Sequence, residues 1–217
     1  MVGDILNILC FGDSNTHGYN PENGKRYERN ERWTGILQNL LGDSDYVIEE
    51  GLSGRTTVFD DPLYEGLSGL DYIIPTLMTH EPIDLLIIML GTNDTKDRFG
   101  ASAEVISLGL DRLIKKAKFC ELAFRNSKPN ILVVAPLPIR EEIKNAECYY
   151  TMGKSCSEKS YNIIPLYEKV AKENGCHFFD PSPFAVCSDY DYMHLSKEAH
   201  GILGKKLYEI ISDIKNK

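Results

Sequence analysis

The sequence predicts a single α/β domain built on a doubly wound parallel sheet. Short apolar runs of strand length alternate along the chain with longer segments whose apolar residues recur at helical spacing. The run at 83–90 is nearly continuous in apolar character, as expected of a central parallel strand covered on both faces. Alternation of strand and helix is typical of such a sheet. The composition shifts nowhere along the chain, so we expect one domain spanning residues 1–217.

Five apolar runs are the predicted strands, and they occupy residues 5–11, 46–48, 83–90, 131–135 and 177–179. Two helices are well marked: one follows Ser102 and the other follows Ser196, and serine is a favoured cap at both places. The stretch 140–160 has a mixed pattern, which we interpret as an insertion over the rim of the sheet. A helix is expected after this stretch, and we expect Pro165 to interrupt that helix.

Composition and charge argue against some classes of binding partner. The net charge of −8 argues against nucleic acid and anionic membranes, because both require a basic face. No apolar run is long enough to span a bilayer, and residues 1–4 carry an acid and no basic leader region. The six cysteines form no C-x-x-C pair, which favours free thiols in a reducing cytoplasm. We therefore expect a cytoplasmic protein.

Residues suited to acyl transfer follow four of the predicted strands. Ligands of an open parallel sheet bind beyond the carboxyl ends of its strands. Ser14 follows the first strand, Gly54 the second and Asn93 the third, while Asp191 and His194 lie in the loop after the fifth. We therefore expect a hydroxyl, a backbone amide, a side-chain amide and an acid–imidazole pair at one edge of the sheet.

These residue types match the needs of a serine nucleophile. A serine hydroxyl requires an adjacent base, which His194 supplies, and Asp191 can hold the imidazole in the right tautomer. The N–H groups of Ser14 and Gly54 and the amide of Asn93 can stabilise the oxyanion of a tetrahedral intermediate. The prediction is a cofactor-free catalytic site, with no metal, that acts on a small ester substrate.

Residues close to these candidates in the sequence are expected to support the site. His17 lies three residues after Ser14, and we expect it to line the substrate pocket and serve in recognition. Asp13 and Asp94 are expected to brace their loops by accepting backbone hydrogen bonds. Arg55 either pairs with one of these two carboxylates or faces solvent.

Each of these blocks taken singly is also typical of an ordinary turn, and two alternatives remain open. One is a metal-dependent phosphoesterase that uses Asp13, Asn93, Asp94 and His194 as ligands. It has only one well-placed histidine, and it does not require Ser14. The other is a non-catalytic flavodoxin-like binding module that has lost its activity. That alternative predicts an incomplete triad, whereas all three residues are present.

The combination of motifs resembles the SGNH (GDSL-type) hydrolase family. The four blocks are Gly12-Asp13-Ser14, Gly54, Asn93 within Gly-Thr-Asn-Asp, and Asp191-x-x-His194. The resemblance is greatest to the aryl esterase/acyltransferase branch, and the segments that carry it are Arg32-Trp33-Thr34-Gly35, Glu49 to Ser53, Arg55-Thr56-Thr57, Asp61-Pro62 and Ile87 to Lys96. Position 15 is Asn where the family name expects Leu, and His17 replaces an aromatic residue common in that branch.

The resemblance implies a three-layer α/β/α flavodoxin-like sandwich with a central five-stranded parallel sheet. It also implies a metal-free acyl-enzyme mechanism on small esters with short acyl chains, of which acetyl is the expected one. Members of the branch include homo-oligomers and enzymes that pass the acyl group to alcohols. Both properties are expectations for this chain.

Overall fold

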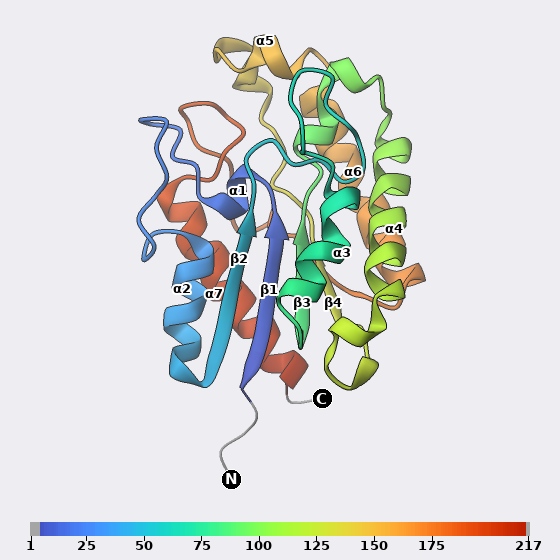
Figure 1. The fold of residues 1–217 in the computed structure, drawn as a ribbon. Coiled ribbons are helices and arrows are strands. Elements are labelled where there is room, and N and C mark those ends of the chain that lie inside the picture. Colours follow the sequence, from blue (N-terminus) through green and yellow to red (C-terminus); the bar gives the residue numbers. More distant parts are fainter. Residues whose placement is uncertain (1–4, 216–217) are drawn as a thin grey trace.

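The computed structural model describes residues 5–215, so residues 1–4, on which the expectation of no leader rests, lie outside the described part. Five parallel strands form one sheet in the order β2-β1-β3-β4-β5 (Figure 1). The strands are β1 (Leu6–Gly12), β2 (Asp45–Gly51), β3 (Leu85–Met89), β4 (Ile131–Val134) and β5 (His177–Phe179). The predicted fold class is confirmed.

The strand order reverses beside β1. The chain passes from β1 to β2 on one side and then returns to place β3 on the other side of β1. Loops that leave β1 and β3 therefore diverge from each other at the carboxyl edge, and this switch point is where open α/β sheets bind ligands. Ser14 follows β1, and Asn93 follows β3.

Helices cover both faces of the sheet (Figure 1). One face carries α2 (Trp33–Leu41) and α7 (Lys197–Lys215), and the other carries α3 (Gly69–Thr79), α4 (Ala103–Phe119) and α6 (Cys156–Glu173). Two helices are short, namely α1 (Ser14–His17) and α5 (Tyr149–Met152). Turns of 3₁₀ helix occupy Gly42–Ser44, Asn93–Thr95, Asp97–Phe99, Glu121–Ala123, Arg125–Ser127 and Glu141–Asn145. Within the described residues, no helix has the length and apolar character needed to cross a membrane.

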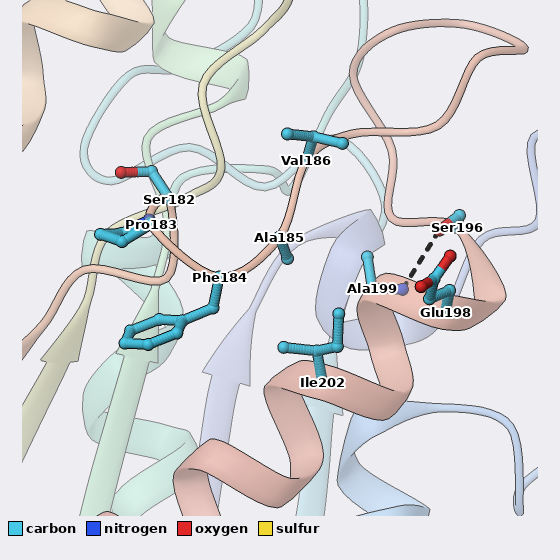
Figure 2. A pocket seen from close by; sticks show the side chains of 9 residues that line it. All are labelled: Ser182, Pro183, Phe184, Ala185, Val186, Ser196, Glu198, Ala199 and Ile202. Carbon is cyan, nitrogen blue, oxygen red and sulfur yellow. Dashed lines mark hydrogen bonds between the residues drawn. The ribbon is translucent and has the colours of Figure 1, made fainter.

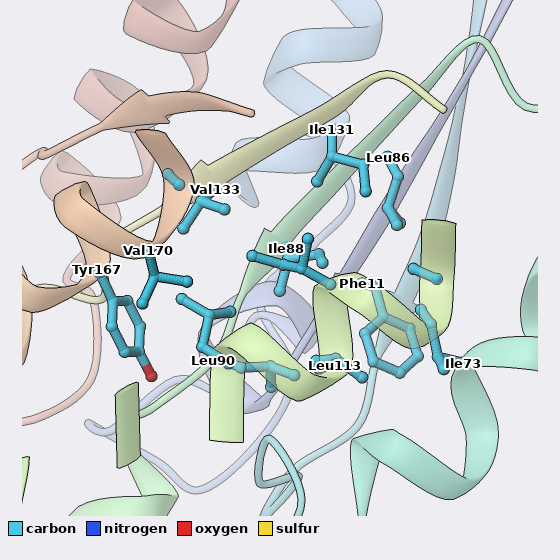
Figure 3. Packing of buried hydrophobic residues seen from close by; sticks show 14 of the residues in the cluster. Phe11, Ile73, Leu86, Ile88, Leu90, Leu113, Ile131, Val133, Tyr167 and Val170 are labelled. Atoms are coloured by element: carbon cyan, nitrogen blue, oxygen red, sulfur yellow. The ribbon is translucent and has the colours of Figure 1, made fainter. Parts of the chain in front are cut away.

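Successive side chains of each strand point to opposite faces of the sheet, so the core has two layers. On β1, Leu9 and Phe11 face α3, α4 and α6, while Ile8 and Cys10 face α2 and α7. Figure 3 shows the first layer, in which strand residues such as Ile88 pack among helical side chains. Burial of each large apolar side chain contributes about 1.5–3 kcal/mol, so both layers hold the carboxyl edge of the sheet in place.

The two serine caps are confirmed. The hydroxyl of Ser102 accepts a hydrogen bond from the N–H of Val105 at 3.4 Å, and that of Ser196 accepts from Ala199 at 3.1 Å. The expectation for Pro165 is wrong, because α6 runs unbroken from Cys156 to Glu173 with this proline inside it. The helix buries Ile163 and Tyr167 in the core, and this packing outweighs the backbone hydrogen bond that proline removes.

Strand β2 is longer than predicted. The predicted strand ends at Ile48, whereas Glu49 and Glu50 both belong to β2. Arg32 and Thr34 donate to Glu49, and His80 lies 2.8 Å from Glu50. Hydrogen-bonding partners from distant segments thus allow Glu49 and Glu50 to lie in a strand.

The segment 140–160 lies over the carboxyl edge of the sheet, as expected of an insertion above its rim (Figure 1). It contains a 3₁₀ turn and α5, and Met152 of α5 is buried. Its position places side chains of α5 above the strand ends that carry Ser14 and Asn93.

Candidate active site

Ser14 begins α1, immediately after the chain leaves β1. The carboxylate of Asp13 accepts a hydrogen bond from the N–H of Asn15 at 2.9 Å and caps the turn. A Cβ atom on Gly12 would fall 2.0 Å from the hydroxyl of Thr16, so only glycine permits this tight passage from strand to helix. The turn presents the Ser14 hydroxyl at the sheet edge.

His194 joins Ser14 to Asp191. Its Nε2 lies 2.9 Å from the Ser14 hydroxyl, and its Nδ1 lies 2.5 Å from a carboxylate oxygen of Asp191. Ser14 is 6% exposed and His194 8% exposed, so the contacts are largely shielded from water. A hydroxyl beside an imidazole that a carboxylate orients is the arrangement that activates a serine nucleophile.

Asp191 also organises its own loop. Its second carboxylate oxygen accepts from the N–H groups of Met193 and His194 at 3.1 and 3.0 Å and from the Ser188 hydroxyl at 3.1 Å. Burial by itself raises the pKa of Asp191, but the hydrogen bonds and charge of His194 hold that pKa below its usual value. The carboxylate is therefore ionised at neutral pH and can stabilise an imidazolium.

Two contacts that sequence reasoning missed hold His194 in place. The side-chain oxygen of Asn15 accepts a hydrogen bond from the N–H of Leu195 at 2.9 Å, although the residues are 180 positions apart. The ring of Tyr19 lies 4.5 Å from the ring of His194. No spacing rule links these residues, and only the presence of Asn at position 15 gave a signal.

Gly54 and Asn93 line the same pocket as Ser14. Gly54 has a φ of 89°, a left-handed conformation that disfavours other residues. The Nδ2 atom of Asn93 donates to the carbonyl of Arg55 at 3.1 Å. An amide nitrogen carries two hydrogens, so this bond orients the group and leaves its other hydrogen available to a ligand.

Asp13 and Asp94 brace loops behind the pocket, as expected. Asp94 accepts a hydrogen bond from the N–H of Thr57 at 2.9 Å and another from the Thr57 hydroxyl. Burial raises the pKa of Asp13 and that of Asp94 to about 6 each. In residues 5–215, no group of three or more His, Cys, Asp or Glu side chains is placed to hold a metal ion.

The pocket has a volume of about 480 Å³. Its lining residues come from five loops, and they are Ser14, Tyr19, Ser53, Gly54, Tyr64, Glu65, Leu67, Asn93, Lys96, Thr151, Met152, Met193 and His194. The side chains that follow β1, β2, β3 and β5 are thus brought together at one edge. The sequence did not indicate the roles of Tyr64, Lys96 or Met152 in this lining.

A smaller pocket of about 270 Å³ lies between the segment 182–186 and the start of α7 (Figure 2). It too contains a serine and an acid, Ser196 and Glu198. The Ser196 hydroxyl is occupied as the cap of α7, and Glu198 lies in the first turn of that helix, where a negative charge is favoured. These groups serve the helix, in contrast to those around Ser14.

A comparison with protein families settles the classification. Residues 10–202 match the model of the GDSL-like Lipase/Acylhydrolase family. This chain belongs to that family. The match includes the segments that carry Ser14, Gly54, Asn93, Asp191 and His194.

Similar proteins have esterase names. The chain is 26% identical over 191 residues to an acetylxylan esterase of Xylanibacter ruminicola; the match covers 82% of this chain but only 36% of that curated relative. Est24, a carbohydrate acetylesterase from Sinorhizobium meliloti, is 35% identical with a TM-score of 0.89, and the match covers 96% of this chain and 99% of Est24. An aryl esterase of M. smegmatis is 34% identical with a TM-score of 0.87, at 96% and 99% coverage.

His17 occupies a different place from the one expected. It is the last residue of α1, half-buried near Gly51, and it is not among the residues that line the pocket of this GDSL-type acylhydrolase. Gly18, with a φ of 85°, reverses the chain directly afterwards. As a result Tyr19 returns to the pocket in place of His17.

Arg55 interacts through its charge with Asp13, one of the two expected partners, but forms no direct ion pair with it in the described residues. It is 5% exposed and therefore does not face solvent, and its guanidinium donates to the carbonyls of Gly12 and Glu50. It also lies over the ring of Phe11, 4.1 Å from the centroid. The side chain thus ties together the ends of β1 and β2, while its backbone carbonyl orients Asn93.

Proposed function

We propose that this acylhydrolase is a serine esterase that hydrolyses small carboxylic esters, above all acetates, through an acyl-enzyme at Ser14. The observation that carries the proposal is the unbroken series of contacts from the Ser14 hydroxyl through His194 to Asp191. Ser14 and His194 line a pocket of a size suited to a small ester.

In the proposed mechanism, Ser14 Oγ attacks the ester carbonyl while His194 Nε2 takes its proton. The imidazolium is stabilised by Asp191, and the oxyanion receives hydrogen bonds from the N–H groups of Ser14 and Gly54 and from the Asn93 amide. Collapse of the intermediate releases the alcohol, which is protonated by His194. Water then attacks the acyl-enzyme by the same steps and frees the acid and Ser14.

The names of the similar proteins support the choice of substrate. Two of them carry acetyl ester activity on carbohydrate in their names, and the third is an aryl esterase. A short acyl group with a variable alcohol part is the feature these names share. We therefore propose acetyl esters as the substrate class.

Transfer of the acyl group to an alcohol is a second use of the same acyl-enzyme. Leu67, Met152 and Met193 give the pocket apolar surface on which an alcohol can compete with water. Partition of product between acid and new ester, measured with a competing alcohol, tests this proposal.

We also propose a reducing, cytoplasmic location. All six cysteines are free thiols, and Cys10, Cys156 and Cys187 are buried. Thiols in this state suit a compartment that keeps them reduced. Localisation of a tagged full-length protein tests this.

The test of function is hydrolysis of p-nitrophenyl acetate by the wild type, Ser14→Ala and His194→Ala. We expect each variant to lose about 10⁴-fold or more in kcat, because nucleophile and base act as a unit. Ser212→Ala and His177→Ala, outside the pocket, are matched controls with wild-type rates. An undiminished rate in folded Ser14→Ala discards the proposal. A phosphoesterase activity that survives this substitution and falls with chelator favours the metal-dependent alternative.

A further inference from the structure

Lys96 is a buried cation in the pocket of Ser14. It follows the 3₁₀ turn Asn93–Thr95 and lines the same pocket as Ser14, Gly54 and Asn93. The residue is only 8% exposed. A lysine is rarely buried to this extent unless it is paired.

The pairing of its ammonium group is weak. Within residues 5–215, no side chain or carbonyl lies within hydrogen-bond distance of Lys96 Nζ, and its ion-pair contact is with a carboxylate oxygen of Asp61 at 3.9 Å. That same oxygen is held by Arg98 at 2.6 Å. Asp61 is therefore already paired with Arg98, so the described residues give Lys96 Nζ one distant ion pair and no hydrogen bond.

Because Lys96 lines the pocket, a ligand that enters it can supply the hydrogen-bond acceptor that the described residues do not. Other polar groups face the same space, namely the hydroxyl-bearing side chains Tyr19, Ser53, Tyr64 and Thr151. Convergent hydrogen-bonding groups on a pocket wall fix the orientation of a polar ligand.

The charges around Lys96 favour a neutral acceptor over an anion. Burial and Arg98 lower the pKa of Lys96, whereas the carboxylates of Asp61, Asp13 and Asp94 raise it. Asp61 is paired with Arg98, but the carboxylates of Asp13 and Asp94 also act on the ammonium, and Glu65 lines the same pocket. These acids would repel an anionic ligand but not a hydroxyl.

We propose that Lys96 determines specificity by donating hydrogen bonds to a neutral oxygen on the alcohol part of the ester. Esters of polyhydroxy alcohols such as sugars are then favoured over esters of hydrocarbon alcohols with the same acyl group. The inference rests on the proposed ester hydrolysis at Ser14. A site built to bond a substrate hydroxyl discriminates strongly against an analogue that lacks it.

The test compares kcat/KM on three acetates: a monoacetylated neutral monosaccharide, a monoacetylated uronic acid and p-nitrophenyl acetate. The measured quantity is the ratio of the sugar acetate to the aryl acetate within each enzyme. In Lys96→Met we expect this ratio to fall about 10- to 100-fold, the effect of one hydrogen bond from a charged donor. Lys96→Gln keeps a neutral donor and loses less on the neutral sugar. Lys205→Met, at an exposed position of α7, leaves the ratio unchanged.

Three results overturn the proposal. An unchanged ratio in Lys96→Met shows that the ammonium does not bind the alcohol part, and an equal loss on all three esters shows a structural role. A loss confined to the uronic acid acetate shows recognition of an anion. If Lys96→Met does not fold, the ratio in Lys96→Gln decides between the same outcomes. Absence of Ser14-dependent hydrolysis of all three esters by the wild type is a different result, because it refutes the proposed function itself.

Discussion

The proposed active site consists of two halves that are held in place by different means. The nucleophile half, with Ser14, Gly54 and Asn93, emerges directly from β1 and from the segments after β2 and β3. The acid–base half, Asp191 and His194, lies in the loop between the end of β5 at Phe179 and the start of α7 at Lys197. The first half is fixed by the sheet. The second is fixed by hydrogen bonds around one carboxylate.

The two halves therefore depend on different contacts for their positions. Buried groups such as Asp94 and Arg55 brace the nucleophile half from behind. The acid–base half instead depends on Asp191, which accepts four hydrogen bonds from Ser188, Met193 and His194. Asn15, from the first half, bonds Leu195 in the second.

Asp191→Asn disrupts the chemistry of the acid–base half while it keeps much of the loop. The amide oxygen can still accept from Met193 and His194, but the NH₂ group now faces His194 Nδ1 and imposes the wrong tautomer. We expect kcat on p-nitrophenyl acetate to fall about 10⁴-fold. Asp191→Ala removes every acceptor and should melt at a lower temperature than Asp191→Asn. Equal melting temperatures contradict the proposed role of this carboxylate in holding the loop.

Asn93→Ala tests the nucleophile half. The Asn93 amide is oriented by the Arg55 carbonyl and contributes one donor to the proposed oxyanion site. Its loss should lower kcat about 10²- to 10³-fold with little change in KM, because the oxyanion develops only in the transition state. Steady-state kinetics on p-nitrophenyl acetate measure this. A rise in KM at constant kcat contradicts it and assigns Asn93 to substrate binding.

Asn15→Leu removes the link between the halves and installs the residue that the family name expects. The N–H of Leu195 then lacks its acceptor, and the His194 loop loses a tether. We expect kcat to fall about 10- to 100-fold, since small displacements of a catalytic group have effects of this size. Asn15→Asp retains an oxygen acceptor and serves as the control. If Asn15→Leu keeps wild-type kcat, the loop is held without this bond.

Asp13→Asn tests the cost of burying charge behind the nucleophile. Because burial raises the pKa of Asp13 from 3.8 to about 6, its linked stability is present below pH 4 and is lost as the pH rises through 6. An uncharged Asn escapes this loss, which amounts to about 3 kcal/mol at most. The melting temperature of Asp13→Asn relative to wild type should therefore increase between pH 4 and pH 7. Asp213→Asn, at an exposed site, is the control, and a difference that is flat with pH contradicts the prediction.

Local sequence patterns were sufficient to predict the sheet, the order of its strands along the chain and the residues at their carboxyl ends. Apolar runs mark buried parallel strands, and Gly12-Asp13-Ser14 is marked as a turn by its residue types. Such signals depend on neighbours within a few positions, so they survive without the fold. The prediction that Ser14, Asn93 and His194 lie together needed only the rule that parallel strands end at one edge.

The residues that surround the proposed catalytic groups became evident only from the folded structure. Three features could not be predicted from sequence spacing, because they depend on contacts between segments far apart in the chain. They are the hydrogen bond between Asn15 and Leu195, the position of Tyr19 in the pocket in place of His17, and the burial of Lys96. The unbroken helix at Pro165 has the same cause, since packing against the core outweighs local propensity. Contacts of this kind depend on how layers pack, and that is fixed only when the whole chain is folded.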